Sequence, residues 1–209
     1  MFVRAPADLN FLAHLLLARE DEALRLGAML GDFVRGREAL SVFDEDVQNG
    51  IMLHRHIDGY TDSLACVVAL RSSLDPPFRR YGGIIIDLVF DHLLAINWSD
   101  YSDIPLEEFD TAVREMLARH DEQLPEDLRG FMRYAGRRGL FAAYRDESEI
   151  LFSLRGVGRR LSRPNPLDRV NEIWPEFRPM AAACFAPAFG QIQSSVADWL
   201  KSKSTMTGS

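Results

Sequence analysis

Acidic residues and histidines interrupt three segments of this chain that are otherwise apolar and helical in spacing. These segments are Leu30-Gly31-Asp32-Phe33, His54-Arg55-His56-Ile57-Asp58, and the run from Ile84 to Leu94, which holds Asp87, Asp91 and His92. An isolated charge is costly to bury, because a lone side chain recovers less free energy than its desolvation costs. Several such groups that converge are typical of a metal site or a proton-transfer site. The pattern therefore predicts a polar cluster inside a helical core.

The apolar spacing predicts helices along most of the chain and shows no alternating strand pattern, so we expect an all-α fold. The expected helices cover residues 8–20, 24–35, 44–63, 64–74, 79–98, 105–122, 148–161 and 167–200, with a further helix after Pro125. Residues 84–89 are rich in Ile and Val, which also favour a buried strand. The length of this run and its continuing apolar pattern favour a helix.

Acid, glycine and proline positions set the expected helix boundaries. Asp8 is expected to cap the first helix, Gly36 to end the second, and Pro76-Pro77 to close the unit that precedes it. The last helix is expected to break near Trp174-Pro175 and near Pro187, because proline removes a backbone hydrogen bond.

Composition restricts the domain organisation, the compartment and the partners. The 209 residues, 47% of them hydrophobic, suit a single helical domain over residues 1–200, with the polar helices in 8–98 and a disordered tail over 201–209. The net charge of −7 argues against nucleic-acid binding through overall charge. No apolar stretch approaches the roughly 20 residues of a membrane helix. Cys66 and Cys184 lack metal-binding spacing, so we expect reduced core thiols in a cytoplasmic protein.

Helical spacing aligns the polar residues in columns. Positions four apart share a helix face, so His54, Asp58 and Asp62 lie in one column. Asp87 and Asp91 lie in another. Two such helices, with contributions from the first two helices, can supply nitrogen and oxygen ligands to a divalent ion. Carboxylates with a few imidazoles suit Mn²⁺, Mg²⁺ or Fe²⁺. The candidate metal ligands are Asp32, His54, Asp58, Asp91, His92, His14 and Asp87.

Some of these polar residues also have ordinary structural interpretations. His14 can be a core histidine bonded to a backbone carbonyl, and Asp62 can cap the following helix or face solvent. His56 is better explained as a surface residue. Asp87 and Asp91 are flanked by large apolar residues on both sides, which favours a functional role.

Four motifs in order resemble a known bacterial family. They are Asn10-Phe11-Leu12-Ala13-His14-Leu15, Gly31-Asp32-Phe33-Val34-Arg35-Gly36, His54-Arg55-His56-Ile57-Asp58 with Thr61-Asp62, and Asp87-Leu88-Val89-Phe90-Asp91-His92-Leu93 followed by Trp98. Together they resemble the acyl carrier protein phosphodiesterase family, also called acyl carrier protein hydrolase. The match is dense through Trp98 and looser afterwards.

The resemblance implies an HD-like helical bundle and a Mn²⁺-dependent hydrolase related to HD-type phosphodiesterases. Such an enzyme removes 4′-phosphopantetheine from the serine of holo-acyl carrier protein, its protein substrate, and leaves the apo form. The pair Asp91-His92 reverses the usual HD order. By matched position, the resemblance implies catalytic or metal roles first for Asp32, His54, Asp58, Asp91 and His92, and then for His14, Asp62 and Asp87.

This chemistry assigns further roles to candidate residues. A bound ion polarises a phosphoryl oxygen and lowers the pKa of its water. His54 or His92 is a candidate to protonate the leaving serine oxygen, and Arg35 or Arg55 to neutralise charge on the phosphoryl oxygens.

Docking of an acidic carrier protein onto this acidic chain requires a local basic surface. The candidates are two arginine groups, although each can also be a solvated helix face: Arg133, Arg137 and Arg138, or Arg155, Arg159, Arg160 and Arg163.

Two other functions stay open. One is an HD-like phosphohydrolase of nucleotides or another small phosphodiester, and the other is a helical module that binds acyl carrier protein without turnover.

Overall fold

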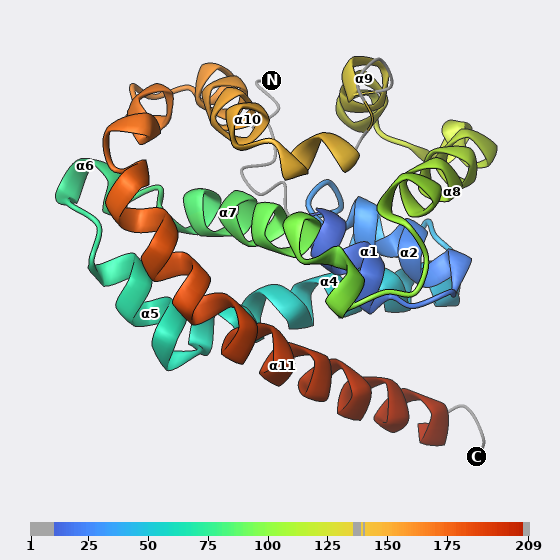
Figure 1. Cartoon of the computed structure of the whole chain (residues 1–209). Coiled ribbons are helices and arrows are strands. Elements are labelled where there is room, and N and C mark those ends of the chain that lie inside the picture. The colour runs from blue at the N-terminus through green and yellow to red at the C-terminus, as the bar shows by residue number, and fades with distance from the viewer. Residues whose placement is uncertain (1–10, 136–138, 140, 207–209) are drawn as a thin grey trace.

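The computed structural model describes residues 11–135, 139 and 141–206, and these residues form helices, turns and loops without a strand (Figure 1). The predicted all-α class is confirmed. The α-helices are α1 (Phe11–Leu17), α2 (Glu22–Leu30), α3 (Gly36–Leu40), α4 (Glu45–Ser63), α5 (Ala65–Ser72), α6 (Pro76–Arg79), α7 (Gly82–Ile96), α8 (Leu106–Arg119), α9 (Glu126–Ala135), α10 (Glu147–Arg160) and α11 (Trp174–Met206). Four 3₁₀ turns join them: η1 (Trp98–Asp100), η2 (Asp121–Gln123), η3 (Ala142–Arg145) and η4 (Leu167–Glu172).

Helix α7 lies at the centre of the molecule, with α1, α5, α10 and α11 packed around it (Figure 1). Twelve of its 15 residues are buried. A helix that is apolar on nearly every side has no face to offer to solvent, so neighbouring helices must surround it. The isoleucine-rich run therefore forms a helix, as its length predicts, and not a strand. Asp91 and His92 are consequently held within the protein, while Asp87 is half-buried.

Helices α2 and α4 approach each other closely at two glycines. A Cβ atom on Gly27 would lie 2.4 Å from the carbonyl oxygen of Val47, and one on Gly50 would lie 2.5 Å from that of Leu24. Side chains at these positions would force the two backbones apart. The contact brings the turn after α2, which carries Asp32, against the middle of α4, which carries His54.

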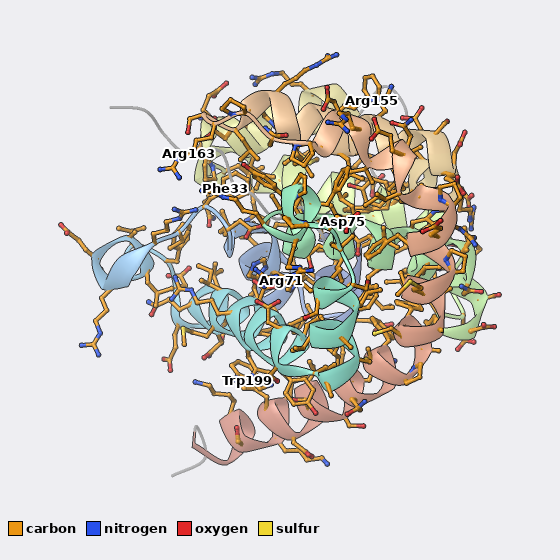
Figure 2. The ribbon with its side chains drawn as sticks, turned by 90° about the vertical axis from the view of Figure 1, so that its left-hand side faces the viewer. Phe33, Arg71, Asp75, Arg155, Arg163 and Trp199 are labelled. Carbon is orange, nitrogen blue, oxygen red and sulfur yellow. The ribbon has the colours of Figure 1, made fainter. Side chains whose placement is uncertain are left out.

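Helix α11 runs without interruption through Pro179 and Pro187, so the predicted break near Pro187 is wrong. The helix packs against α4, α5 and α7, and this burial outweighs the backbone hydrogen bond that each proline removes. Beyond the core, Trp199 of α11 faces His56 of α4, with ring centroids 6.1 Å apart (Figure 2). The predicted boundary at Trp174-Pro175 is confirmed, because α11 begins at Trp174 after the 3₁₀ turn η4.

Several other boundaries differ from those predicted. Gly36, which is predicted to end the second helix, instead begins α3 with a φ of +81°. Helix α2 already ends at Leu30. Pro76 and Pro77, which are predicted to close the preceding unit, also begin the short helix α6, since proline suits the first turn of a helix. The predicted cap Asp8 lies outside the described residues. The tail predicted from residue 201 is helical as far as Met206, and residues 207–209 lie outside the described range.

Two predictions concern reduced cysteines and the lack of a membrane-spanning helix. Cys66 and Cys184 carry free thiols, and the Cys66 Sγ lies 3.9 Å from the carbonyl oxygen of Cys184. In the part of the chain that the structure describes, every helix is too short or too polar to cross a bilayer.

The α2–α4 contact provides a test of the packing. The substitution Gly27→Ala is expected to lower the free energy of unfolding by about 1–3 kcal/mol, because its Cβ meets backbone atoms that cannot yield. Gly59→Ala in α4 is the matched control. Its Cβ meets nothing within 4 Å, so it is expected to be neutral or slightly stabilising. Urea denaturation followed by circular dichroism compares the two, and equal midpoints would contradict the close-contact interpretation.

Candidate metal centre

His14 of α1 and His54 and Asp58 of α4 form a cluster at the junction of the two helices. The potential ligand atoms of these three side chains all lie within 4.8 Å of one another. His14 Nε2 is 3.0 Å from Asp58 Oδ1, and His54 Nε2 is 3.1 Å from Asp58 Oδ2. The two imidazole rings stack with centroids 4.1 Å apart. Both histidines therefore turn one nitrogen toward the same carboxylate.

Asp32 adds a second carboxylate to this cluster from the turn after α2. Its Oδ1 lies 3.3 Å from His54 Nε2. On the other side of the His54 ring, Nδ1 is 2.9 Å from the carbonyl oxygen of Ala28, to which it donates a hydrogen bond. Such a bond fixes the orientation of a metal-binding histidine and leaves Nε2 for the ligand.

The charges in this cluster are strongly coupled. Burial alone lowers the pKa of His54, but the carboxylates of Asp32 and Asp58 beside its Nε2 raise it to about 10. Burial and the nearby charge of His54 lower the pKa of His14. The pKa of Asp58 falls because the two histidines outweigh the effect of its burial. A cation at this position competes with the proton for the same imidazole nitrogen, as at metal sites generally.

Four polar atoms in the cluster lack an aligned hydrogen-bond partner among the described residues: His14 Nδ1, His14 Nε2, His54 Nε2 and Asp32 Oδ2. Both histidine side chains are almost fully buried, and that of Asp32 is 8% exposed. The short N···O distances are those of ion pairs, but the angles are not those of hydrogen bonds. Buried polar atoms without partners are costly. The cluster therefore fits a divalent ion, which would satisfy one nitrogen of each histidine and the Asp32 oxygen at once.

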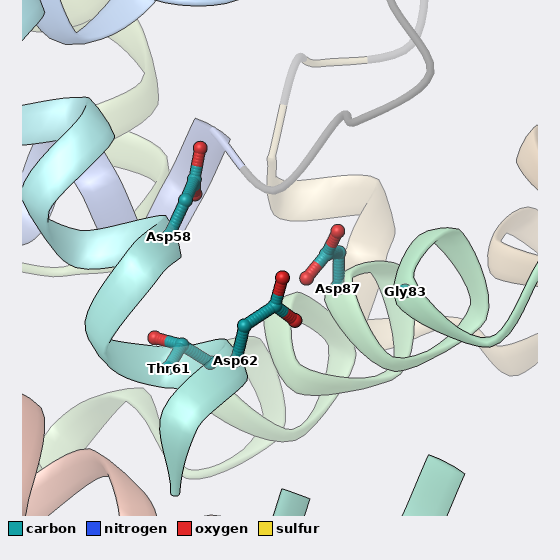
Figure 3. A pocket seen from close by; sticks show the side chains of 5 residues that line it. All are labelled: Asp58, Thr61, Asp62, Gly83 and Asp87. Carbon is teal, nitrogen blue, oxygen red and sulfur yellow. The ribbon is translucent and has the colours of Figure 1, made fainter. Parts of the chain in front are cut away.

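A small pocket of about 70 Å³ opens beside the cluster, between α4 and α7. Asp58, Thr61 and Asp62 line it from α4, and Gly83 and Asp87 line it from α7. The Asp58 side chain is 35% exposed, so it connects the buried histidines to the pocket. Figure 3 shows the carboxylates of Asp62 and Asp87 directed toward each other across the gap. The pocket thus joins two columns of acids that the sequence analysis placed on separate helices.

Asp91 lies outside this cluster and holds α1 in place. Its two carboxylate oxygens accept hydrogen bonds from the backbone N–H groups of Leu12 and Ala13, each at 3.0 Å. These amides belong to the first turn of α1, where helical N–H groups have no partner within the helix. Burial raises the pKa of Asp91 to about 8, against the opposing effect of the two amide bonds. Asp91 is therefore a positioning residue for α1, and a ligand role for it stays a prediction.

His92 also points away from the cluster. Its Nδ1 lies 2.8 Å from the carbonyl oxygen of Tyr144 in η3, and its ring centroid lies 6.0 Å from that of Trp174 in α11. Because His92 follows Asp91, it faces about 100° around α7 from the side that meets α1. Its predicted ligand and proton-donor roles stay predictions.

The two candidate arginines are placed differently. Arg55 Nη2 donates to the carbonyl oxygen of Val34 at 2.8 Å and so supports the segment after Asp32. Arg35 is exposed at the start of α3. His56, which the sequence analysis assigns to the surface, is half-buried, and its Nε2 lies 2.9 Å from Ser195 Oγ of α11.

Gly31 is a further requirement of the site. A Cβ atom there would lie 2.2 Å from Cγ of the His54 ring, so only glycine allows the ring its observed position. No role for Gly31 in the cluster is predicted from the sequence. Its spacing of one turn from Gly27, which indicates close helix packing, and its adjacency to Asp32 are the signals that could have indicated one.

Comparison with known proteins bears on this site. The family model described as acyl carrier protein phosphodiesterase matches residues 9–192, which include the whole cluster. Relatives named acyl carrier protein phosphodiesterase from Escherichia coli strains CFT073 and S88 are each 36% identical over 167 residues. Each match covers 79% of this chain and 84% of the relative. No solved structure matches the chain. The resemblance drawn from the four motifs is confirmed.

The role of Gly31 can be tested by metal binding. Gly31→Ala is expected to displace the His54 ring and weaken Mn²⁺ affinity at least about tenfold, because small shifts in ligand position are costly at metal sites. Isothermal titration calorimetry measures the affinity. Gly59→Ala, beside Asp58 but in open space, is expected to bind Mn²⁺ as the unaltered protein does. Similar affinities for both variants would show that Gly31 does not constrain the ring.

The role of Asp91 is tested by stability. Asp91→Ala leaves two amides of α1 without acceptors and is expected to lower the free energy of unfolding by about 2–4 kcal/mol. Asp91→Asn keeps one acceptor oxygen, so a smaller loss is expected. Thermal and urea denaturation of the chelator-treated protein measure both. A residue that served only as a metal ligand would show no such loss once the metal is removed.

Proposed function

This chain belongs to the acyl carrier protein phosphodiesterase family, and from that premise we propose that it cleaves 4′-phosphopantetheine from holo-acyl carrier protein. The products are apo-acyl carrier protein and 4′-phosphopantetheine. The observation that carries the proposal is the buried cluster of His14, His54 and Asp58 beside an open pocket. We assign the reaction to the cytoplasm, in keeping with the two free thiols.

The proposed cofactor is Mn²⁺, with Mg²⁺ and Fe²⁺ compatible with the same donors. His14, His54 and Asp58 would hold the ion, and Asp32 would stand beside them as a further carboxylate. Imidazole and carboxylate donors without thiolate suit these ions. When bound, such an ion polarises a phosphoryl oxygen and makes a water molecule more acidic.

The charge of the pocket supports the need for a cation. Asp58, Asp62 and Asp87 line the same small space, and a phosphodiester is itself an anion. The negative charges of these carboxylates repel an anionic phosphodiester strongly in a partly buried pocket. Without a compensating positive charge, the pocket would exclude the substrate that the family name indicates.

The side chains of the pocket have separate tasks in this proposal. The attacking water adds its oxygen to phosphorus, the bond from phosphorus to the serine oxygen breaks, and a proton must reach that oxygen. Asp62 and Asp87 lie across the pocket from each other, where one carboxylate can accept the proton of the water and return it. His54 is better suited as a ligand than as the acid, because its Nδ1 donates to the carbonyl oxygen of Ala28 and its Nε2 faces the carboxylate of Asp58 inside the cluster.

Family membership favours this reaction over the alternatives. It favours a protein substrate over a free nucleotide, and hydrolysis over simple binding. The HD-like relationship remains a proposal based on motif resemblance. Charge neutralisation by Arg35 or Arg55 also remains a prediction, and Arg55 is committed to Val34.

The test is a mass assay on holo-acyl carrier protein. With Mn²⁺ the protein is expected to shift to the apo mass, and chelation should stop the shift. Asp58→Ala and His14→Ala are each expected to slow turnover at least about 100-fold, because they remove donors from the cluster. His56→Ala is the matched histidine control, since it lies against α11, and is expected to retain turnover.

Melting curves accompany every variant, so that lost folding is not read as lost chemistry. A folded protein loaded with Mn²⁺ that leaves holo-acyl carrier protein unchanged would contradict the proposed function. Full turnover by Asp58→Ala would contradict the assigned metal centre.

A further inference from the structure

The arginines of this protein divide into paired and unpaired groups. Those of α8, α9 and the adjoining turns largely form ion pairs, such as Arg119 with Glu22 at 2.6 Å and Arg133 with Glu126 at 2.7 Å. A second group is exposed and forms no ion pair within the part of the chain that the structure describes: Arg71, Arg79, Arg80, Arg155, Arg159 and Arg163.

Three of the unpaired arginines, Arg71, Arg80 and Arg163, come from segments that meet at the first turn of α7. We call them the rim arginines. The Cγ of Arg71 lies so close to Gly82 that a Cβ there would be 2.9 Å away, and the next residue, Gly83, lines the pocket.

The other two segments are joined by one hydrogen bond. Tyr81 donates its hydroxyl to the carbonyl oxygen of Pro164 at 3.2 Å. Arg80 precedes Tyr81 and Arg163 precedes Pro164, so this bond connects their segments. Figure 2 shows Arg71 and Arg163 on one face, together with Phe33, the neighbour of Asp32.

The position of the scissile bond sets what must approach this rim. In the proposed substrate the phosphorus is attached directly to a serine oxygen of the carrier protein. When the phosphodiester enters the pocket, the protein surface around that serine must touch the rim. Residues beside Gly83 would therefore contact the substrate protein around that serine.

The charges favour an acidic partner surface. This chain carries a net charge of −7, so most of its surface repels an acidic protein. Exposed arginines without acidic partners offer planar donors that match carboxylates. Asp75 lies between Arg71 and Arg80 in the sequence, but it forms no ion pair with either arginine in the described structure.

We propose that Arg71, Arg80 and Arg163 form the docking surface for the acidic face of the carrier protein, an inference that rests on the proposed function. Arg155 and Arg159 extend this basic surface along α10. It includes three members of the second arginine group named in the sequence analysis. In the first group, Arg133 is already paired, and Arg137 and Arg138 lie outside the described residues.

The experiment compares two triple variants with equal loss of positive charge. The rim variant is Arg71→Gln, Arg80→Gln and Arg163→Gln. The control is Arg119→Gln, Arg129→Gln and Arg133→Gln on α8 and α9, at the opposite end from α6 (Figure 1). Kinetics use holo-acyl carrier protein and, separately, bis(p-nitrophenyl) phosphate, a phosphodiester without a protein. Fluorescence anisotropy measures binding of labelled apo-acyl carrier protein at low and high salt.

The rim variant is expected to raise KM for holo-acyl carrier protein, and Kd for the apo form, at least about tenfold. Its kcat and its turnover of the small diester should stay as in the unaltered enzyme. Salt should weaken binding by the unaltered enzyme and affect the rim variant less. The control variant should stay within about twofold of the unaltered enzyme in every measurement.

Failure of the docking proposal differs from failure of the proposed function. If the rim and control variants bind and cleave the carrier protein equally well, or if the unaltered protein does not bind it, docking at the rim is overturned. If the unaltered protein binds the apo form through the rim arginines but cleaves nothing, docking stands and the proposed function falls. The three single substitutions, each expected to weaken binding about twofold to threefold, repeat the test should the triple variant melt early.

Discussion

The hydrogen bonds from α1 to Asp91 determine whether the candidate metal centre can exist. Helix α1 has only seven residues, which is too short to be stable without tertiary contacts. Asp91 accepts from the first-turn amides of Leu12 and Ala13, and so attaches this short helix to the buried helix α7. His14 follows Ala13 directly and reaches Asp58 only because α1 is held at this position. A carboxylate of α7 thus positions a ligand of α1 without meeting the cluster itself.

Helix α4 combines the ligand set and the pocket wall in one column. His54 and Asp58 are four residues apart and meet at 3.1 Å, and Asp62 continues the same face into the pocket. His54 can be buried because α2 approaches α4 closely, and Gly31 leaves space for its ring. Backbone geometry, more than the acids and histidines, therefore sets how near the ligands come to one another.

The sequence predicts the helices of the site well, because α4 and α7 carry long apolar patterns that outweigh local signals. It also predicts that His54 and Asp58 lie together, since positions four apart share a face. It names Asp32 and His14 only as candidate contributions from the first two helices. It does not predict the partners of Asp91, because backbone N–H groups leave no mark in a sequence. The direction of His92 depends on η3 and α11, far along the chain. The continuity of α11 through Pro187 is likewise a result of tertiary burial.

The distribution of charge explains how one acidic protein can accept an anionic substrate. Carboxylates line the pocket, so the phosphodiester is attracted there only when a cation offsets them. The rim arginines, which form no ion pair with the residues that the structure describes, are proposed to attract an acidic protein before its phosphodiester reaches the pocket. The two positive contributions act at different points, the arginines on the protein surface and the cation on the reacting group. On this proposal, selection of the carrier protein and cleavage of its phosphodiester are expected to change separately on substitution.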